Sequence, residues 1–479
     1  MERLKGGASY DDIVGRGQGR VDELIGFLFK CGILGLIENL PNLMKRSHDI
    51  PRRFIRYCVA LRPVLGISGI SQIGAKLFSD PAVIGALGFS LIEIEEGFSS
   101  SKNKKKENVP CNLDAFYDEL TRLAPGDWRR LLSGQIMLLA RRGFLSDRDG
   151  VFALDGSELE VKGKTFQRAG MIAKEETVLK ADGKTTKRFV KKRGYKLVVL
   201  LKVTKNQSYV AAASIIPIHR SELKVTKQLI NAALGCLPEK TIRLLLIDRG
   251  FMDGKLFNFL KEKNIDFIIP TKDNMHITSD MRGLIKLDGT ITAEASDGTE
   301  LAGVSSLRTL DTCNHALRGV LITKTRDGEI PKKDQQFGFV TSLPASRQSQ
   351  VVRVYESYRR RWTIETGCFE ELKRAWFLNS FPGRSFRAVY AHVILTLFMF
   401  NAVKAFLTER GEDQAVKGLI SLRHRYLKPH RDLVVYQGEY VAILTLPELL
   451  EACGMPPPGK YRNNRIKIIW PDNPRELKG

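Results

Sequence analysis

The segment Tyr355–Trp376 reads YESYRRRWTIETGCFEELKRAW and has the composition of an amphipathic helix. It contains no proline, and its apolar residues recur at helix-like intervals, at Trp362, Phe369, Leu372 and Trp376. A helix would place Tyr358, Arg361 and Glu365 on roughly one face, because they stand at positions i, i+3 and i+7. A phenol, a guanidinium and a carboxylate together suit a phosphate held near a metal ion. The alternative is an amphipathic helix whose charged face is only solvated.

Two aspartates follow apolar runs upstream of this segment. The run Val151–Leu154 leads into Asp155, and the run Leu244–Ile247, typical of a strand buried on both faces, ends in Asp248. Acids that end neighbouring strands of an open sheet face the same functional crevice. Because aspartate is also a common turn residue, each aspartate alone is weak evidence, and the combination with Glu365 is stronger.

These stretches resemble DDE transposases of prokaryotic insertion sequences, the group with a Tyr-Arg-Glu-Lys signature. Tyr358, Arg361 and Glu365 have the spacing of that signature, and the RWxIE sequence that begins at Arg361 matches its core. The DGS sequence at Asp155 and the DRGF sequence at Asp248 also look like the family's characteristic stretches. The resemblance covers roughly residues 150–405.

The lysine of the signature is displaced. The family places it seven positions after the glutamate, where this chain has Leu372, and Lys373 stands one residue later. A π-helical turn near Gly367 would absorb the extra residue and return Lys373 to the face of Glu365. Otherwise Lys373 is not the equivalent residue.

The resemblance implies an α/β fold with a ribonuclease H-like mixed sheet flanked by helices. It implies that Asp155, Asp248 and Glu365 are catalytic and hold two Mg²⁺ ions, for which Mn²⁺ can substitute. Carboxylates suit hard cations of this kind, and two ions can serve the attacking and leaving oxygens of a displacement at phosphorus. The residues that would hold phosphates near the cleaved bond are Tyr358, Arg361 and Lys373.

The function that the resemblance implies is cut-and-paste transposition of an insertion sequence through a DNA hairpin. The partners would be double-stranded DNA, at the terminal inverted repeats and at the target, and a second copy of the chain. Two alternatives remain open: a ribonuclease H-like nuclease without strand transfer, and a DNA-binding remnant that no longer cuts.

Composition agrees with a nucleic-acid partner. Lys and Arg number 76 against 53 Asp and Glu, a net charge of +23, which favours a polyanion and places nucleic acid ahead of an anionic membrane. The seven cysteines form no CxxC pair, so we expect reduced thiols in a cytoplasmic, nucleoid-associated protein without a zinc module. The apolar run Ala388–Val403 contains polar residues, which predicts a buried helix rather than a membrane span.

The sequence pattern changes along the chain and predicts three domains. Residues 1–149 are mainly helical and are a candidate for binding DNA ends. Residues 150–405 form the catalytic domain, with a β-rich insertion at about 271–337 before the last catalytic helix. Residues 406–479 form a C-terminal region suited to dimerisation or DNA contact.

Two further features concern DNA. The segment Lys184–Lys196, KTTKRFVKKRGYK, is strongly basic and either contacts DNA or forms a solvated loop. The family also carries an aromatic residue on the strand before the signature helix, which stacks on a base beside the break. Phe337 stands near that position and is the proposed stacking residue, with Phe339 as the alternative. Both would otherwise pack in the core.

Overall fold

The computed structural model of the chain describes residues 12–15, 21–42, 50–78, 80–89, 93, 97–98, 110–146, 149–179, 185–204, 207–287, 291–325, 329, 338–361, 365–416, 418–427, 432–437 and 440–454. The chain forms two compact units. We call Leu132–Arg374 the sheet unit, and Met1–Leu131 together with Ala375–Gly479 the helical unit. The predicted domain boundaries at 149/150 and 405/406 divide the chain by function and stay predictions.

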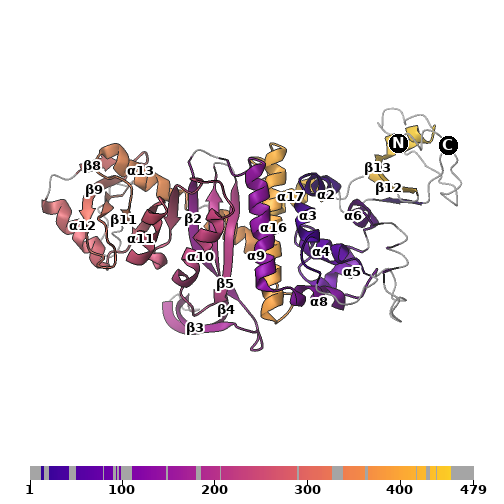
Figure 1. Cartoon of the computed structure of the whole chain (residues 1–479), viewed down its shortest axis with the longest axis horizontal. Coiled ribbons are helices and arrows are strands. Elements are labelled where there is room, and N and C mark those ends of the chain that lie inside the picture. The colour runs from indigo at the N-terminus through magenta and orange to yellow at the C-terminus, as the bar shows by residue number, and fades with distance from the viewer. Residues whose placement is uncertain are drawn as a thin grey trace. The chain divides into compact units, whose positions relative to one another are not determined.

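The sheet unit contains one large mixed sheet (Figure 1). Its described strands are β2 Val151–Glu160, β3 Gly170–Leu179, β4 Thr185–Val203, β5 Ser208–Pro217, β6 Leu244–Ile247, β7 Asp266–Thr271, β8 Ile291–Glu294, β9 Glu300–Leu307, β10 Leu317–Lys324 and β11 Gly338–Thr341. They run in the order β3-β4-β2-β6-β7-β11-β10-β9-β8, and β5 also pairs with β4. Strands β2, β6 and β7 are parallel, and β4 is antiparallel to β2.

Helices flank this sheet, so the predicted mixed α/β class is confirmed. Helix α10 Leu223–Leu234 packs on β4 and β5, and α11 Gly254–Glu262 packs on β7. Each connects one strand to a later parallel strand, because a parallel pair requires a crossover connection. Helix α11 begins where the side chain of Asp253 accepts a hydrogen bond from the backbone N–H of Lys255, which caps its first turn.

The predicted β-rich insertion contains β8, β9 and β10, which extend the sheet beyond β11. It also contains a helix that the sequence analysis missed, α12 His276–Leu287. The buried residues Ile277 and Met281 stand four apart, which places both on one helical face toward the sheet. The helix packs closely enough on β10 that a Cβ atom at Gly319 would collide with Met281.

Two local predictions in the sheet unit were wrong. Asp155 does not end its strand, because β2 continues through Asp155 to Glu160. The basic segment Lys184–Lys196, for which a solvated loop was one alternative, is not a loop over its described residues. From Thr185 onward it is the first part of β4, which is 19 residues long and pairs there with β3.

The helical unit is built mainly from short helices around one long helix. The described helices are α2 Val21–Lys30, α3 Ile33–Glu38, α4 Arg52–Leu61, α5 Ile73–Lys76, α6 Pro81–Ala86, α8 Asp114–Arg122, α16 Phe386–Glu409, α17 Leu419–Tyr426 and α18 Leu446–Ala452. Helix α9 Pro125–Arg141 contains the boundary between the two units. A small sheet pairs β1 Asp12–Gly15 with β12 Asp432–Gln437, and β12 with β13 Tyr440–Thr445.

Helix α16 forms the core of the helical unit. By length and composition it could cross a membrane, but 94% of its most apolar stretch is buried inside the protein, as in the core helix of a soluble protein. Its polar residues have partners there: the ring of His392 meets the guanidinium of Arg62 at 2.9 Å and the backbone oxygen of Leu378 at 3.1 Å. The prediction of a buried helix at Ala388–Val403 is confirmed.

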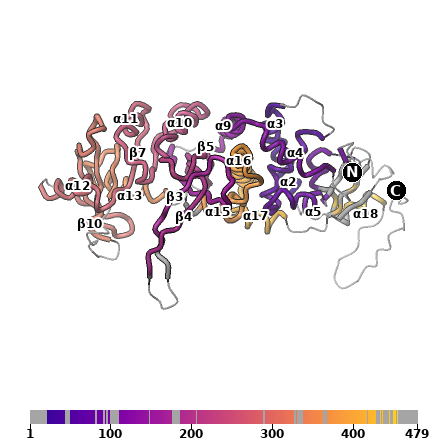
Figure 2. The backbone as a smooth tube through the Cα atoms, turned by 90° about the horizontal axis from the view of Figure 1, so that it is seen from below, coloured from indigo at the N-terminus to yellow at the C-terminus, as the bar shows by residue number. Residues whose placement is uncertain are grey.

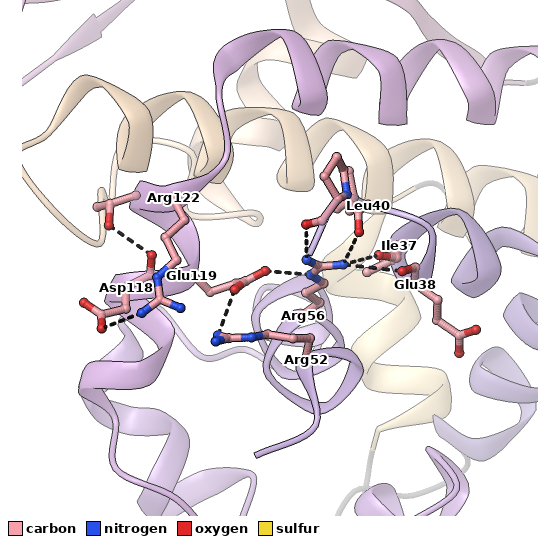
Figure 3. A network of polar contacts seen from close by, with 10 residues as sticks. Ile37, Glu38, Leu40, Arg52, Arg56, Asp118, Glu119 and Arg122 are labelled. Atoms are coloured by element: carbon pink, nitrogen blue, oxygen red, sulfur yellow. Dashed lines mark hydrogen bonds and ion pairs between the residues drawn. The ribbon is translucent and has the colours of Figure 1, made fainter. Parts of the chain in front are cut away.

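A buried arginine joins three helices of this unit (Figure 3). Arg56 on α4 donates from Nε to Glu119 of α8 at 2.7 Å, and from Nη1 to the backbone oxygens of Ile37 and Leu40 around the end of α3. Arg52, one turn earlier, donates to the other carboxylate oxygen of Glu119 at 3.0 Å. The charge of Glu119 is therefore paired on both oxygens, as a buried carboxylate requires.

Candidate functional site

The register of two parallel strands sets Asp155 beside Asp248. Leu154 of β2 is paired with Ile247 of β6, and each aspartate is the next residue of its own chain segment. The backbone N–H of Asp248 also donates to the backbone oxygen of Leu154. The two acids therefore occupy equivalent positions at the point where β6 ends and β2 continues.

The two carboxyl groups have different surroundings. Asp155 is buried, with 8% of its surface exposed, and its Oδ2 accepts from Nη1 of Arg361 at 2.7 Å. Its Oδ1 accepts from the backbone N–H of Gly156 at 2.7 Å. Asp248 is half-buried, and its Oδ2 accepts from the backbone N–H of Gly250 at 3.3 Å in the short turn after β6. Asp155 is thus held in a buried ion pair, whereas Asp248 is held by a weaker local bond.

Tyr358 lies against both acids. It comes from α13 Gln348–Arg359, is 8% exposed, and lies within hydrogen-bonding distance of the backbone oxygen of Ile247, at 3.5 Å. Burial raises the pKa of its phenol, and the charges of Asp248 and Asp155 raise it further against the opposing effect of Arg361. The phenol therefore stays protonated at neutral pH and is a hydrogen-bond donor.

The tyrosine ring packs against two neighbouring side chains. The guanidinium of Arg361 lies 5.5 Å from the ring centroid of Tyr358, and the ring of Phe339 lies 4.9 Å from it. Phe339 is only 2% exposed. It therefore supports Tyr358 from the core, which excludes it as the alternative base-stacking residue. Phe337 lies outside the described residues.

The single helix expected over Tyr355–Trp376 is interrupted. Helix α13 ends at Arg359, a π-helical turn covers Glu365–Phe369, and α15 covers Glu370–Arg374. A π-helical turn near Gly367 was one of the two alternatives for the extra residue before Lys373, and it is present. The side chain of Glu365 lies outside the described part of the structure, so its place in the site stays a prediction.

Lys373 lies near acids of β2 beyond Asp155. Burial lowers the pKa of its ammonium group, and the carboxylates of Glu158 and Glu160 act in the opposite direction. The π-helical turn is thus present, and the carboxylates that act on Lys373 among the described residues are those of Glu158 and Glu160. Its role as the signature lysine stays a prediction.

The three consecutive arginines at 359–361 have different partners. Each pairs with a different acid: Arg359 with Asp297 at 2.9 Å, Arg360 with Asp149 at 3.0 Å, and Arg361 with Asp155 at 2.7 Å. Arg360 also donates to the backbone oxygen of Val203, at the end of β4. The run therefore fixes the end of α13 against the sheet, and Arg361, the arginine that the signature spacing singled out, is the one that pairs with Asp155.

The two aspartates are candidate ligands for a divalent metal ion. Asp155 and Asp248 offer carboxylate oxygens from adjacent positions, which is the donor type that Mg²⁺ prefers. Among the described side chains, no group of three or more His, Cys, Asp or Glu comes together. The two aspartates fit such an ion, and the third predicted ligand is Glu365.

Comparisons with known proteins were made by sequence and by structure. Residues 146–402 match the family described as "Transposase DDE domain". A search of curated proteins gave no match. One similar solved structure is described as "Cryo-EM structure of piggyBac transposase synaptic complex with hairpin DNA (SNHP)". It is 11% identical, the match covers 81% of this chain and 79% of that chain, and the TM-score is 0.31. A TM-score of 0.31 is too low to show that the two chains share a fold.

Proposed function

The chain belongs to the transposase DDE-domain family, whose match extends over more than half of its length, and from this premise we propose that it is a cut-and-paste transposase. It would hydrolyse a phosphodiester at each end of an insertion sequence and free a 3′-hydroxyl. That hydroxyl would attack the opposite strand to form a hairpin, which is reopened before the end is joined to target DNA.

The observation that carries this proposal is the juxtaposition of Asp155 and Asp248, with Arg361 and Tyr358 against them. The chemistry of DNA cleavage requires groups of this kind: two acids from neighbouring strands, one arginine and one protonated phenol. The acids provide negative charge for a metal ion, and the other two groups provide donors for phosphate oxygens.

The central strand arrangement supports a ribonuclease H-like fold for the catalytic domain. Strands β5, β4, β2, β6 and β7 are consecutive in the sheet, with β4 antiparallel to β2, and β2, β6 and β7 parallel. We infer that these five strands are the ribonuclease H-like core and that β8–β10 belong to the insertion. In such a core, acids beside the end of β6 stand where the substrate phosphate would lie.

The proposed metal ligands are Asp155, Asp248 and Glu365, which would hold two Mg²⁺ ions, with Mn²⁺ as a substitute. When bound, such ions activate the attacking oxygen and stabilise the leaving oxygen. The protein's own part is positioning. Oδ2 of Asp155 accepts from Arg361, and the carboxylate keeps further lone pairs that would be available to a metal ion.

Arg361 would give this site its phosphate donor, because only one of its five N–H groups is needed for the bond to Asp155. Arg361 presents a planar fork of N–H groups that suits two phosphate oxygens at once. The neighbouring phenol of Tyr358 remains protonated and can donate a further hydrogen bond. Lys373 is the third proposed phosphate-binding residue, and Phe337 is the proposed base-stacking residue in the hairpin.

The proposed partner is double-stranded DNA at the element's inverted repeats and at the target, bound by a homodimer. The net charge of +23 supports a polyanionic partner. We propose that the protein acts in the cytoplasm, in association with the nucleoid.

Cleavage of DNA by single-residue variants tests the proposal. The probe is a labelled duplex carrying the inverted repeat that flanks the gene, incubated with Mg²⁺. Asp155→Asn, Asp248→Asn and Glu365→Gln should each abolish cleavage and leave DNA binding within a few-fold, because affinity depends mainly on basic contacts. Asp297→Asn is the matched control. Asp297 pairs with Arg359 of α13, the helix that also carries Tyr358, but Asp297 lies outside the site.

The products separate the competing functions. Hairpin products from the wild type identify a transposase, nicks without joining identify a nuclease, and a bound but uncut probe identifies a DNA-binding remnant. Any of the three variants that retains more than about a tenth of wild-type cleavage at saturating Mg²⁺ removes that residue from the site.

A further inference from the structure

Strands β3 and the first half of β4 form a hairpin arm. Ten residue pairs join them, from Gly170 with Gly194 to Leu179 with Thr185. Figure 2 shows the outer part of this hairpin projecting away from the rest of the sheet unit. Strand β3 is at the end of the strand order and pairs with β4 alone among the described strands. At about 3.4 Å per residue the paired arm is roughly 30 Å long, close to one turn of duplex DNA.

The register sorts the side chains of the arm onto two faces. Alternate residues of a strand share a face, and directly opposed residues of an antiparallel pair lie on the same face. We call one of them the ribbon face, formed by Met171, Ala173, Glu175, Lys187, Phe189, Lys191 and Arg193. The opposite face contains Ile172, Lys174, Arg188, Val190 and Lys192.

The cations of the opposite face are largely engaged within the sheet unit. Lys174 pairs with Glu158 at 3.4 Å, and Lys192 pairs with Glu160 at 3.1 Å. The ribbon face instead carries three cations against one acid, Glu175, which pairs with Lys187 at 3.4 Å. Positive charge is therefore in excess on the ribbon face.

Apolar side chains stand exposed among those cations. Phe189 is 74% exposed and Met171 is 57% exposed, although both are among the residue types most often buried. Phe189 lies between Lys187 and Lys191 along the same face. An exposed aromatic ring between lysines suits a partner that has phosphates at its surface and apolar groups, such as thymine methyls, between them, as the major groove of duplex DNA does.

Resting on the proposed function, we propose that the ribbon face binds duplex DNA in the major groove. That groove admits a two-stranded β-ribbon. Lys187, Lys191 and Arg193 contact phosphates beside the groove, and Phe189 and Met171 contact base edges and thymine methyl groups at its floor. The face carries few groups that could read a base by paired hydrogen bonds, so this contact adds affinity along about one turn of DNA more than sequence specificity.

The test compares two sets of charge removals with equal change in net charge. The first variant replaces Lys187, Lys191 and Arg193 of the ribbon face by glutamine. The matched control replaces Lys174, Arg188 and Lys192 of the opposite face by glutamine. Binding to a labelled duplex of about 30 base pairs, roughly three helical turns, is measured between about 50 and 200 mM salt. Thermal unfolding of both variants verifies that they are folded.

The ribbon-face variant should reduce the slope of log affinity against log salt by about 2.7, or about 0.9 for each lost phosphate contact. The control should change it by less than about 1. Phe189→Ala should weaken binding roughly tenfold at an unchanged slope, because it removes apolar contact but no charge. Hydroxyl-radical footprints of the ribbon-face variant should lose protection over about one helical turn.

Equal slope changes in the two variants would overturn the proposal, because they would reflect the overall charge of the arm. Unchanged DNA affinity in Phe189→Ala, together with an altered association state of the DNA-free protein, would instead assign the ribbon face to a second copy of the chain. If the wild type binds no duplex DNA, the proposed function itself fails. If the wild type binds and cleaves DNA while the ribbon-face variant equals its control, only the role of the arm is refuted.

Discussion

Replacing Asp155 by asparagine should destabilise the sheet unit, whereas the same replacement at Asp248 should leave its stability almost unchanged. Both variants are expected to lose cleavage, so stability distinguishes their structural environments. Asp155 is buried in an ion pair of 2.7 Å with Arg361, and both side chains are about a tenth exposed. Asp248 is half-buried and accepts one backbone hydrogen bond of 3.3 Å.

The expected magnitude follows from what asparagine can replace. It keeps an oxygen that can accept from Arg361, but the buried guanidinium loses its counter-charge. Hydrogen bonds to charged groups contribute about 1.5–3 kcal/mol, and breaking a buried pair costs about 3–5 kcal/mol. Because the pair is partly exposed and asparagine retains one hydrogen bond, Asp155→Asn should lower the free energy of unfolding by about 2–3 kcal/mol. In a unit of this size, that corresponds to a melting temperature lower by roughly 4–12 °C. Asp248→Asn should cost less than about 1 kcal/mol.

The assay is urea and thermal unfolding in the absence of divalent metal ions, followed by fluorescence and circular dichroism. A double-mutant cycle that adds Arg361→Gln to Asp155→Asn should give a coupling free energy of at least about 1 kcal/mol, because each single change already removes the pair. The same cycle with Asp248→Asn should give a clearly smaller value. Equal destabilisation by Asp155→Asn and Asp248→Asn, or a coupling near zero, would refute the buried ion pair.

Three further predictions concern other residues. Lys373→Ala should impair cleavage more than Arg374→Ala if the π-helical turn returns the lysine to the active site, and equal activities of the two variants would defeat that role. Phe337→Ala should slow hairpin formation roughly 10- to 100-fold, because stacking contributes about 1–3 kcal/mol per base, and first-strand nicking should be nearly unchanged. Loss of both steps together with a lower melting temperature would assign Phe337 to the core. Burial and the charge of Arg62 lower the pKa of His392 to about 3, so the unfolded chain takes up a proton at His392 that the folded chain does not. Stability should therefore fall by as much as roughly 1.4 kcal/mol per pH unit as the pH drops from about 6.5 toward about 3, and urea unfolding of His392→Gln should show a shallower dependence over that range.

The candidate site was found largely from local sequence. Continuous apolar runs that end in aspartate identified the two acids, and the spacing of Tyr358, Arg361 and Glu365 identified the family. Counting the one extra residue before Lys373 raised a π-helical turn near Gly367 as one of two alternatives, and the turn is present at Glu365–Phe369. These features could be predicted because each depends on the order of residues within a single segment.

Two elements escaped prediction for a local reason. Strand β3 and the first half of β4 form a ribbon that is largely exposed on one face, so they lack the alternation of apolar and polar residues that marks a half-buried strand. Helix α12 contains Gly283 and β-branched residues, which weaken its helical pattern, and packing of Ile277 and Met281 on the sheet overrides that preference.

What the sequence alone determined was therefore the class of most segments, the family, and the residue types available for catalysis. The tertiary structure decided which of those residues meet. The parallel register of β2 and β6 places Asp155 beside Asp248, and the position of α13 assigns Arg361, rather than Arg359 or Arg360, to Asp155. Periodicity and turn signals are properties of neighbouring residues, whereas strand register and ion-pair partners depend on long-range packing that neighbouring residues do not encode.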